Sequence, residues 1–152
     1  MQTIEKKISP TSAYRIAAYS AGAMILFFIF MKLVGLVTIV EFRFLNFIIM
    51  FFGVRYMLLE SRKANQGKLE YLTGMLSGFM TALYTSLFFA VFVFIYLSID
   101  HGFMEYLKAT QPFGSYLTPA SASLITVIEG IAGGSIIAFA MMHLYNRDGD
   151  QG

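Results

Sequence analysis

The chain has 152 residues, of which 57% are hydrophobic and only 13% are charged. An ordinary soluble domain has about a quarter of its residues charged, so lipid must be the solvent for most of this chain. The net charge of +2 is too small to indicate a nucleic-acid partner. The absence of cysteine excludes disulfides, thiolate metal sites and cysteine nucleophiles,.

Two apolar segments in the first part of the chain predict a pair of membrane-spanning helices, at approximately 13–34 and 39–59,. The first follows a Pro-Thr-Ser run at 10–12, which suits a helix start, and is too long for a removable signal peptide. Gly35 interrupts the pattern between the two segments. One continuous helix over 13–59 would be roughly 70 Å long, more than twice the thickness of the hydrocarbon core, so a helical hairpin is favoured.

A second hairpin is predicted in the rest of the chain. The segment 60–71 is polar and is expected to be a solvent loop before a third span at 72–99. A loop at 100–119 then leads to a fourth span at 120–145. Within that loop, the stretch DHGFMEYLKAT fits either a helix lying along the membrane surface or an ordinary ordered loop.

The distribution of basic residues predicts the orientation, because Lys and Arg in short loops resist translocation. One side of the membrane would hold Lys6, Lys7, Arg15, Arg55, Arg62, Lys63, Lys68 and Arg147. The other side would hold only Lys32, Arg43 and Lys108. Both termini and the loop at 60–71 are therefore predicted to be cytoplasmic, and the loop at 100–119 lies outside.

Small residues recur every fourth position in the third and fourth spans. The third span carries Gly74, Gly78, Ala82, Ser86 and Ala90, and the fourth carries Ala122, Thr126, Gly130, Gly134 and Ala138. Ala18 and Gly22 form a shorter stripe in the first span. Because helices in lipid associate by close contact, the stripes predict that the third and fourth spans pack together. A homodimer face or a flexible hinge is the alternative interpretation.

Glu129 is the candidate functional residue, since it is a carboxylate inside the fourth span. An ionisable group in lipid is costly unless it is paired, neutralised or turned to a cavity. Arg43 and Asn46 of the second span lie at a similar expected depth, which suggests an Arg43–Glu129 ion pair. Glu129 would then lock two helices together; alternatively it binds or relays a proton or cation, or contacts a lipid headgroup.

Motifs for catalysis or metal binding are lacking. The sequence has no HExxH, no phosphate-binding glycine loop and no GxSxG,. His101 and His143 are expected on opposite sides of the membrane and so cannot share a metal. We therefore expect neither an enzyme nor a bound cofactor.

The segment from Gly53 to Leu107 resembles a family of small four-helix membrane proteins, common in Bacteroidota, known only as domain of unknown function 4199. The likeness rests on the Gly-Val-Arg sequence at 53–55, the polar loop before an aromatic and small-residue entry into the third span, and the stretch from Ile99 to Glu105. Members often have Asp-Pro where this chain has Asp100 and His101. The resemblance implies the fold and a bacterial inner-membrane address, without a catalytic residue, cofactor or substrate.

Together these features predict a single all-α transmembrane domain over 1–152, a bundle of four spans built from two helical hairpins with both termini inside. Its expected partners are the lipid bilayer and either other membrane subunits or further copies of itself. The expected function is that of a non-enzymatic structural or accessory subunit of a membrane assembly. The alternative is an oligomeric proton- or ion-coupled transporter that uses Glu129 and Arg43.

Overall fold

The computed structural model of the protein describes residues 10–36, 43–66 and 69–149. Its elements are α2 (Pro10–Leu33), α3 (Arg43–Ala64), α4 (Tyr71–Ile99), α5 (His101–Thr110), the 3-10 turn η2 (Gly114–Tyr116) and α6 (Pro119–Gly149). No strand occurs in these ranges, and four of the helices are long and apolar enough to cross a membrane. The predicted all-α, four-span fold is confirmed, whereas the side of the membrane that each terminus faces stays a prediction.

The ends of the helices follow from local sequence. After α2, Gly35 adopts a φ of 77° in the left-handed region, which glycine reaches without steric cost,. The amide of Gly35 then donates to the Lys32 carbonyl, and the amide of Leu36 donates to the Met31 carbonyl. This pair of bonds is the Schellman arrangement, which satisfies carbonyls that a helix end leaves unpaired. Gly35 therefore ends α2 where the sequence pattern breaks.

The helix of the second span continues past the end of the predicted membrane segment. Residues 39–42 lie outside the described part, and α3 continues to Ala64, past the predicted boundary at 59. Arg62 and Lys63 in its last turn favour this extension, since basic side chains interact well with the negative end of the helix dipole,. At the same end of the bundle the Ser12 hydroxyl donates to Glu60 Oε1 at 2.9 Å, joining the start of α2 to the end of α3.

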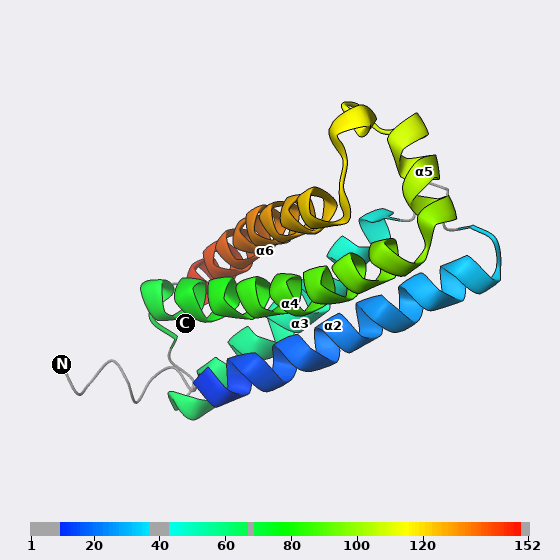
Figure 1. The fold of residues 1–152 in the computed structure, drawn as a ribbon. Helices are drawn as coiled ribbons and strands as arrows, with labels where there is room; N and C mark the ends of the chain where they lie inside the picture. The colour runs from blue at the N-terminus through cyan, green and yellow to red at the C-terminus, as the bar shows by residue number, and fades with distance from the viewer. Residues whose placement is uncertain (1–9, 37–42, 67–68, 150–152) are drawn as a thin grey trace.

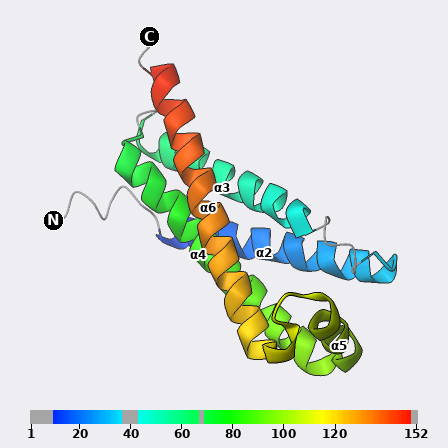
Figure 2. The same ribbon diagram turned by 90° about the horizontal axis from the view of Figure 1, so that it is seen from above.

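Helix α4 occupies the centre of the bundle and contacts α2, α3 and α6. Helix α6 runs antiparallel to α4 and crosses obliquely above the other helices (Figures 1 and 2). The main core is rich in methionine; its buried members are Met24, Met50, Val54, Leu58, Ala82, Phe89, Ala138, Met141 and Met142. Short α5 and η2 project beyond the far end of α4 (Figure 1) and connect it to α6.

The outer loop is thus largely helical. The stretch DHGFMEYLKAT forms a helix, α5, whereas its placement along the membrane surface stays a prediction. Asp100 explains where α5 begins, because its side chain accepts a hydrogen bond from the Phe103 amide at 2.9 Å and so caps the helix,. We refer to α5 and η2 together as the cap.

Candidate functional site

The helix pair α4–α6 determines where open space exists in the bundle. Four residues of each helix meet in antiparallel register: Gly74 with Met142, Gly78 with Ala138, Ala82 with Gly134 and Ser86 with Gly130. A Cβ atom added at Gly78 would lie 2.6 Å from the Ala138 Cβ, and one added at Gly134 would collide with Ala82. We call this contact the seam. Its closeness requires the small residues that the stripes contain.

A second row of small polar residues on α4 is also buried. Ser77, Thr81 and Thr85 are fully inaccessible, and each hydroxyl donates to the carbonyl four residues earlier, at 2.7–2.9 Å. Ser86 does the same toward Ala82. A hydroxyl bonded in this way is satisfied inside apolar surroundings and has no donor left for a ligand.

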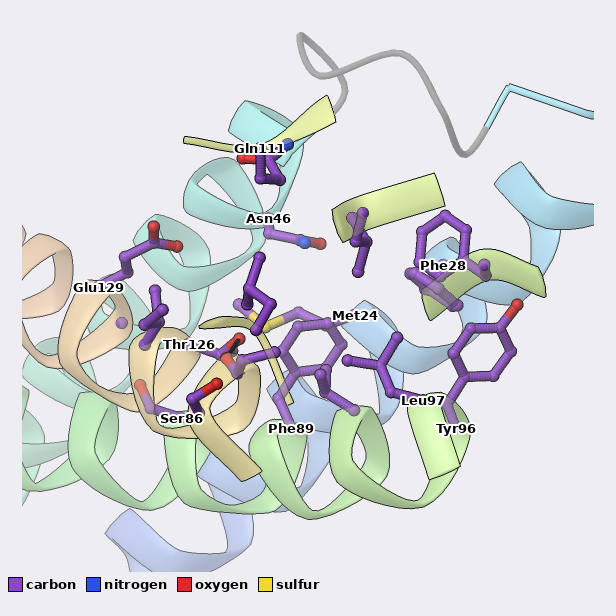
Figure 3. A pocket seen from close by; sticks show the side chains of 18 of the residues that line it. Met24, Phe28, Asn46, Ser86, Phe89, Tyr96, Leu97, Gln111, Thr126 and Glu129 are labelled. Atoms are coloured by element: carbon purple, nitrogen blue, oxygen red, sulfur yellow. Dashed lines mark hydrogen bonds between the residues drawn. The ribbon is translucent and has the colours of Figure 1, made fainter. Parts of the chain in front are cut away.

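Beyond the seam the helices line a partly open cavity of about 580 Å³, within the range of about 300–1,000 Å³ typical of ligand sites,. It lies between α2, α3, α4, α6 and the cap (Figure 3). The apolar walls include Met24, Phe27, Phe28, Met31, Phe47, Met50, Phe89, Val93, Leu97, Phe103, Leu107, Ala122 and Ile125. Polar groups are few, and Asn46, Gln111, Thr126 and Glu129 are among them.

The cap is fastened to the bundle by an ionic contact. Lys32 Nζ lies 2.7 Å from Asp100 Oδ2, and the Tyr96 hydroxyl donates to the same oxygen at 2.7 Å. Lys32 also lies over the Tyr96 ring, 4.6 Å from its centroid. The bond from Lys32, helped by the Phe103 amide, holds the pKa of Asp100 well below its usual range,. Helices α2, α4 and α5 therefore meet at this one carboxylate.

The turn after α5 closes the cap tightly. Gly114 is buried, and a side chain there would collide with the backbone carbonyl of Lys108. The residue before it, Phe113, has a φ of 59°, a conformation that non-glycine residues seldom adopt,. The Phe113 ring lines the cavity although it is largely exposed. The cap thus reaches α6 through a compact turn that borders the cavity.

Asn46 presents an unsatisfied group to the cavity. Its Oδ1 atom is buried, and no residue that the structure describes donates a hydrogen bond to it. Figure 3 shows the Asn46 side chain extending from α3 among the residues that line the pocket. A buried acceptor without a donor costs about 1–3 kcal/mol, so this oxygen is a marked departure from normal packing.

Glu129 lies on α6 at the edge of the same cavity (Figure 3) and is exposed on the surface of the bundle. One turn further along α6, the Phe47 ring of α3 packs against Gly133. A Cβ atom at Gly133 would collide with this ring. The cavity brings Glu129 and Asn46 together. The Arg43 side chain, and with it the predicted Arg43–Glu129 ion pair, lies outside the described residues.

Other sequence predictions have mixed outcomes. The predicted stripe of the first span is wrong: Ala18 is exposed and nothing lies within 4 Å of a Cβ added at Gly22. The small residues that α2 buries are Ala13, Ala17 and Ala21. His101 is the first residue of α5. His143 lies on α6, near the end of its apolar part. In the described ranges no group of three His, Asp or Glu side chains is placed to hold a metal.

The sequence did not reveal the cavity or the Lys32–Asp100 contact. An Asp at position 100 can accept a hydrogen bond from the amide three residues later. This is a typical signal for the start of a helix, and it favours a helix that begins at His101. The partner of Asp100 is 68 positions away in the chain, so no local pattern indicates it. Asn46 was noted for its expected depth alone; its unpaired oxygen becomes evident only when α3 is packed in place.

These features define a four-span α-helical membrane protein with a ligand-sized apolar cavity in one half of its bundle. Over residues 15–146 the chain matches the family described as "Protein of unknown function (DUF4199)", and it belongs to that family. No curated protein and no solved structure matches the chain. The match confirms the resemblance and leaves the function to be inferred from the site.

Proposed function

We propose that the protein is a non-enzymatic accessory subunit of a larger membrane assembly, bound to an unlike partner through the outward face of α6. The observation that carries this proposal is the exposure of α6: it is the least enclosed of the four described spans, with 17% of its most apolar stretch buried against 33% in each of the others. Glu129 is among its exposed residues and lies about 15 Å along α6 from Pro119, at about 1.5 Å per residue,.

A neighbouring transmembrane helix would gain close contacts along this face, because helices in lipid associate through packing. Burial of the α6 face would at the same time cover the edge of the cavity. Both effects favour a second protein over bare lipid as the surroundings of α6.

Purification in mild detergent from native membranes tests this role, with a matched pair of variants. Ala132 lies on the exposed side of α6 near Glu129, and Ala18 lies exposed on α2. We expect the protein to carry an unlike chain in fixed stoichiometry, which Ala132→Trp removes and Ala18→Trp retains. Recovery of a monomer, or of a partner that both variants retain equally, would overturn the proposed interface.

A second candidate function is an oligomeric proton- or ion-coupled transporter. It is favoured by the presence of Glu129 and Asn46 on one cavity. Two features disfavour a transport path between α4 and α6. The helices are in close contact along the seam, and the buried α4 hydroxyls donate to carbonyls of their own helix. A complex made only of copies of this chain, with a pH-dependent flux in proteoliposomes that Glu129→Gln abolishes, would favour the transporter.

We further propose that the protein resides in the bacterial cytoplasmic membrane with both termini inside. Support comes from Arg15, Arg55, Arg62 and Lys63, which gather near one end of the bundle, as the positive-inside tendency requires,. Because the chain has no cysteine, single cysteines report the topology cleanly. A membrane-impermeant maleimide should label Ser115→Cys in intact spheroplasts and leave Lys63→Cys unlabelled; the reverse pattern would invert the orientation.

A further inference from the structure

The cavity combines apolar walls with a hydrogen-bond acceptor that lacks a donor. Met24, Phe89 and Leu97 face it from α2 and α4, and the cap covers it from outside (Figure 3). Two hydroxyls that line the cavity are already committed: Ser86 donates to the Ala82 carbonyl and Thr126 donates to the Ala122 carbonyl at 3.0 Å. The wall therefore leaves the Asn46 oxygen without a donor among the described residues.

We propose that this cavity binds a single-chain amphiphile with an uncharged hydroxyl head, a long-chain or isoprenoid alcohol. The chain fills the aromatic and methionine-lined space, and the hydroxyl donates to Asn46 Oδ1. Apolar pockets with one or a few placed polar groups are the usual form of small-molecule sites, where the polar groups fix the orientation of the ligand. Methionine and phenylalanine walls suit a flexible hydrocarbon because methionine adapts its shape to the ligand.

The chemistry of the Asn46 oxygen selects against an acidic head group. An ionised carboxylate or phosphate diester offers hydrogen-bond acceptors only, whereas the Asn46 oxygen needs a donor,. A hydroxyl carries no charge and brings the one donor that Asn46 lacks. The site is thus suited to a free alcohol and unsuited to a fatty acid or a phospholipid head group.

A water molecule is the simplest rival occupant of the Asn46 oxygen. A buried water normally makes about three hydrogen bonds. Most side chains that line the cavity are apolar and offer a water few further partners; Gln111 and Thr126 are polar, and the Thr126 hydroxyl already donates to the Ala122 carbonyl. A ligand hydroxyl needs only the one bond, because its chain gains contact with the apolar wall at the same time.

Two matched probes separate the hydroxyl from the chain. The protein, in nanodiscs of phosphatidylcholine, is irradiated with a diazirine-bearing hexadecanol, and unlabelled hexadecanol or hexadecyl methyl ether competes. The ether has the same chain and no donor. We expect hexadecanol to compete at an about three- to tenfold lower concentration than the ether, as one hydrogen bond implies. Equal competition by the two compounds would overturn the proposal.

Variants locate the bound probe. Asn46→Leu removes the acceptor, so the two competitors should become equal; a preference for hexadecanol that persists in this variant would refute the role of Asn46. Ala122→Trp fills the cavity and should abolish labelling, while Ala120→Trp, an exposed neighbour on α6 outside the cavity, should not. Labelling that survives Ala122→Trp would assign the probe to the lipid surface. The comparison in the unaltered protein stands even if a variant does not fold, and no readout depends on a partner subunit.

Discussion

Along one half of their contact, α4 and α6 touch so closely that a Cβ at Gly134 would collide with Ala82; beyond Ser86 and Gly130 the same helices border a cavity. Ser86 and Gly130 belong to both regions, so the change happens at one helical turn. Past them, Phe89 and Val93 of α4 line the cavity in place of the small residues of the seam. The solid part of the pair thus coincides with small side chains at facing positions, which allow close helix contact in lipid.

The largest expected effect is from breaking the seam. Gly134→Ala places a methyl group against Ala82 and forces the helices apart, with an expected loss of about 3 kcal/mol in the free energy of unfolding,. Thermal or denaturant unfolding in detergent measures it. Gly22→Ala is the matched control, because nothing lies within 4 Å of a Cβ there, and it should be neutral or stabilising,. Equal losses in both variants would show that the seam is not tight.

A smaller effect is expected in the cap. Gly114→Ala places a methyl group against the Lys108 carbonyl, so the turn must shift, at a cost of about 1–2 kcal/mol,. Hydrogen exchange should then quicken in α5 and η2 while the amides of the seam remain protected. Gly102→Ala serves as control, since its nearest neighbour would be Asp100 Oδ1 at an ordinary 3.6 Å. Faster exchange throughout α4 and α6 would mean that the two regions unfold together.

The cavity itself should tolerate loss of its polar group. Asn46→Leu removes a buried acceptor that lacks a donor, so we expect the ligand-free protein to gain about 1 kcal/mol in the free energy of unfolding,. The melting temperature of delipidated protein measures this gain. Asn65→Leu provides the contrast, because the Asn65 amide donates to the Ser61 carbonyl at 2.9 Å and its loss should destabilise. A lower melting temperature for Asn46→Leu would indicate that Asn46 is already satisfied.

The smallest effect concerns pH. The lowered pKa of Asp100 means that its contact with Lys32 contributes stability fully above the ordinary value of 3.8,. That contribution is lost as pH falls below this value toward the folded-state pKa. The protection factors of the α5 amides, which correct for the intrinsic pH dependence of exchange, should therefore fall between about pH 4 and pH 2. Asp100→Asn should have lower protection factors already at neutral pH and lack this acid-dependent fall; an unchanged profile of protection against pH in the variant would assign the effect to another group.

The seam could be predicted from the sequence more readily than the cavity. A four-residue repeat of small side chains is visible in the third and fourth spans, and within it Gly78, Ala82 and Ser86 face Ala138, Gly134 and Gly130 in the structure. The same type of pattern misled in α2, where Ala18 and Gly22 do not mark the packed face and Ala13, Ala17 and Ala21 are buried. Periodicity shows that a face exists, whereas contact with neighbours decides which face is used. The cavity depends on how five elements diverge, which no single repeat encodes.

The regular spacing of the seam has a further consequence for its register. If α6 moved along α4 by four residues, about 6 Å, Gly74 would meet Ala138, Gly78 would meet Gly134 and Ala82 would meet Gly130, so small residues would again face small residues,. The seam therefore sets the distance between the helices but does not distinguish these two alignments. That choice depends on the end of the seam where Met142 fits over Gly74, and on the length of the connection through the cap. The cap and the Met142 contact together therefore select one alignment from two nearly equivalent ones.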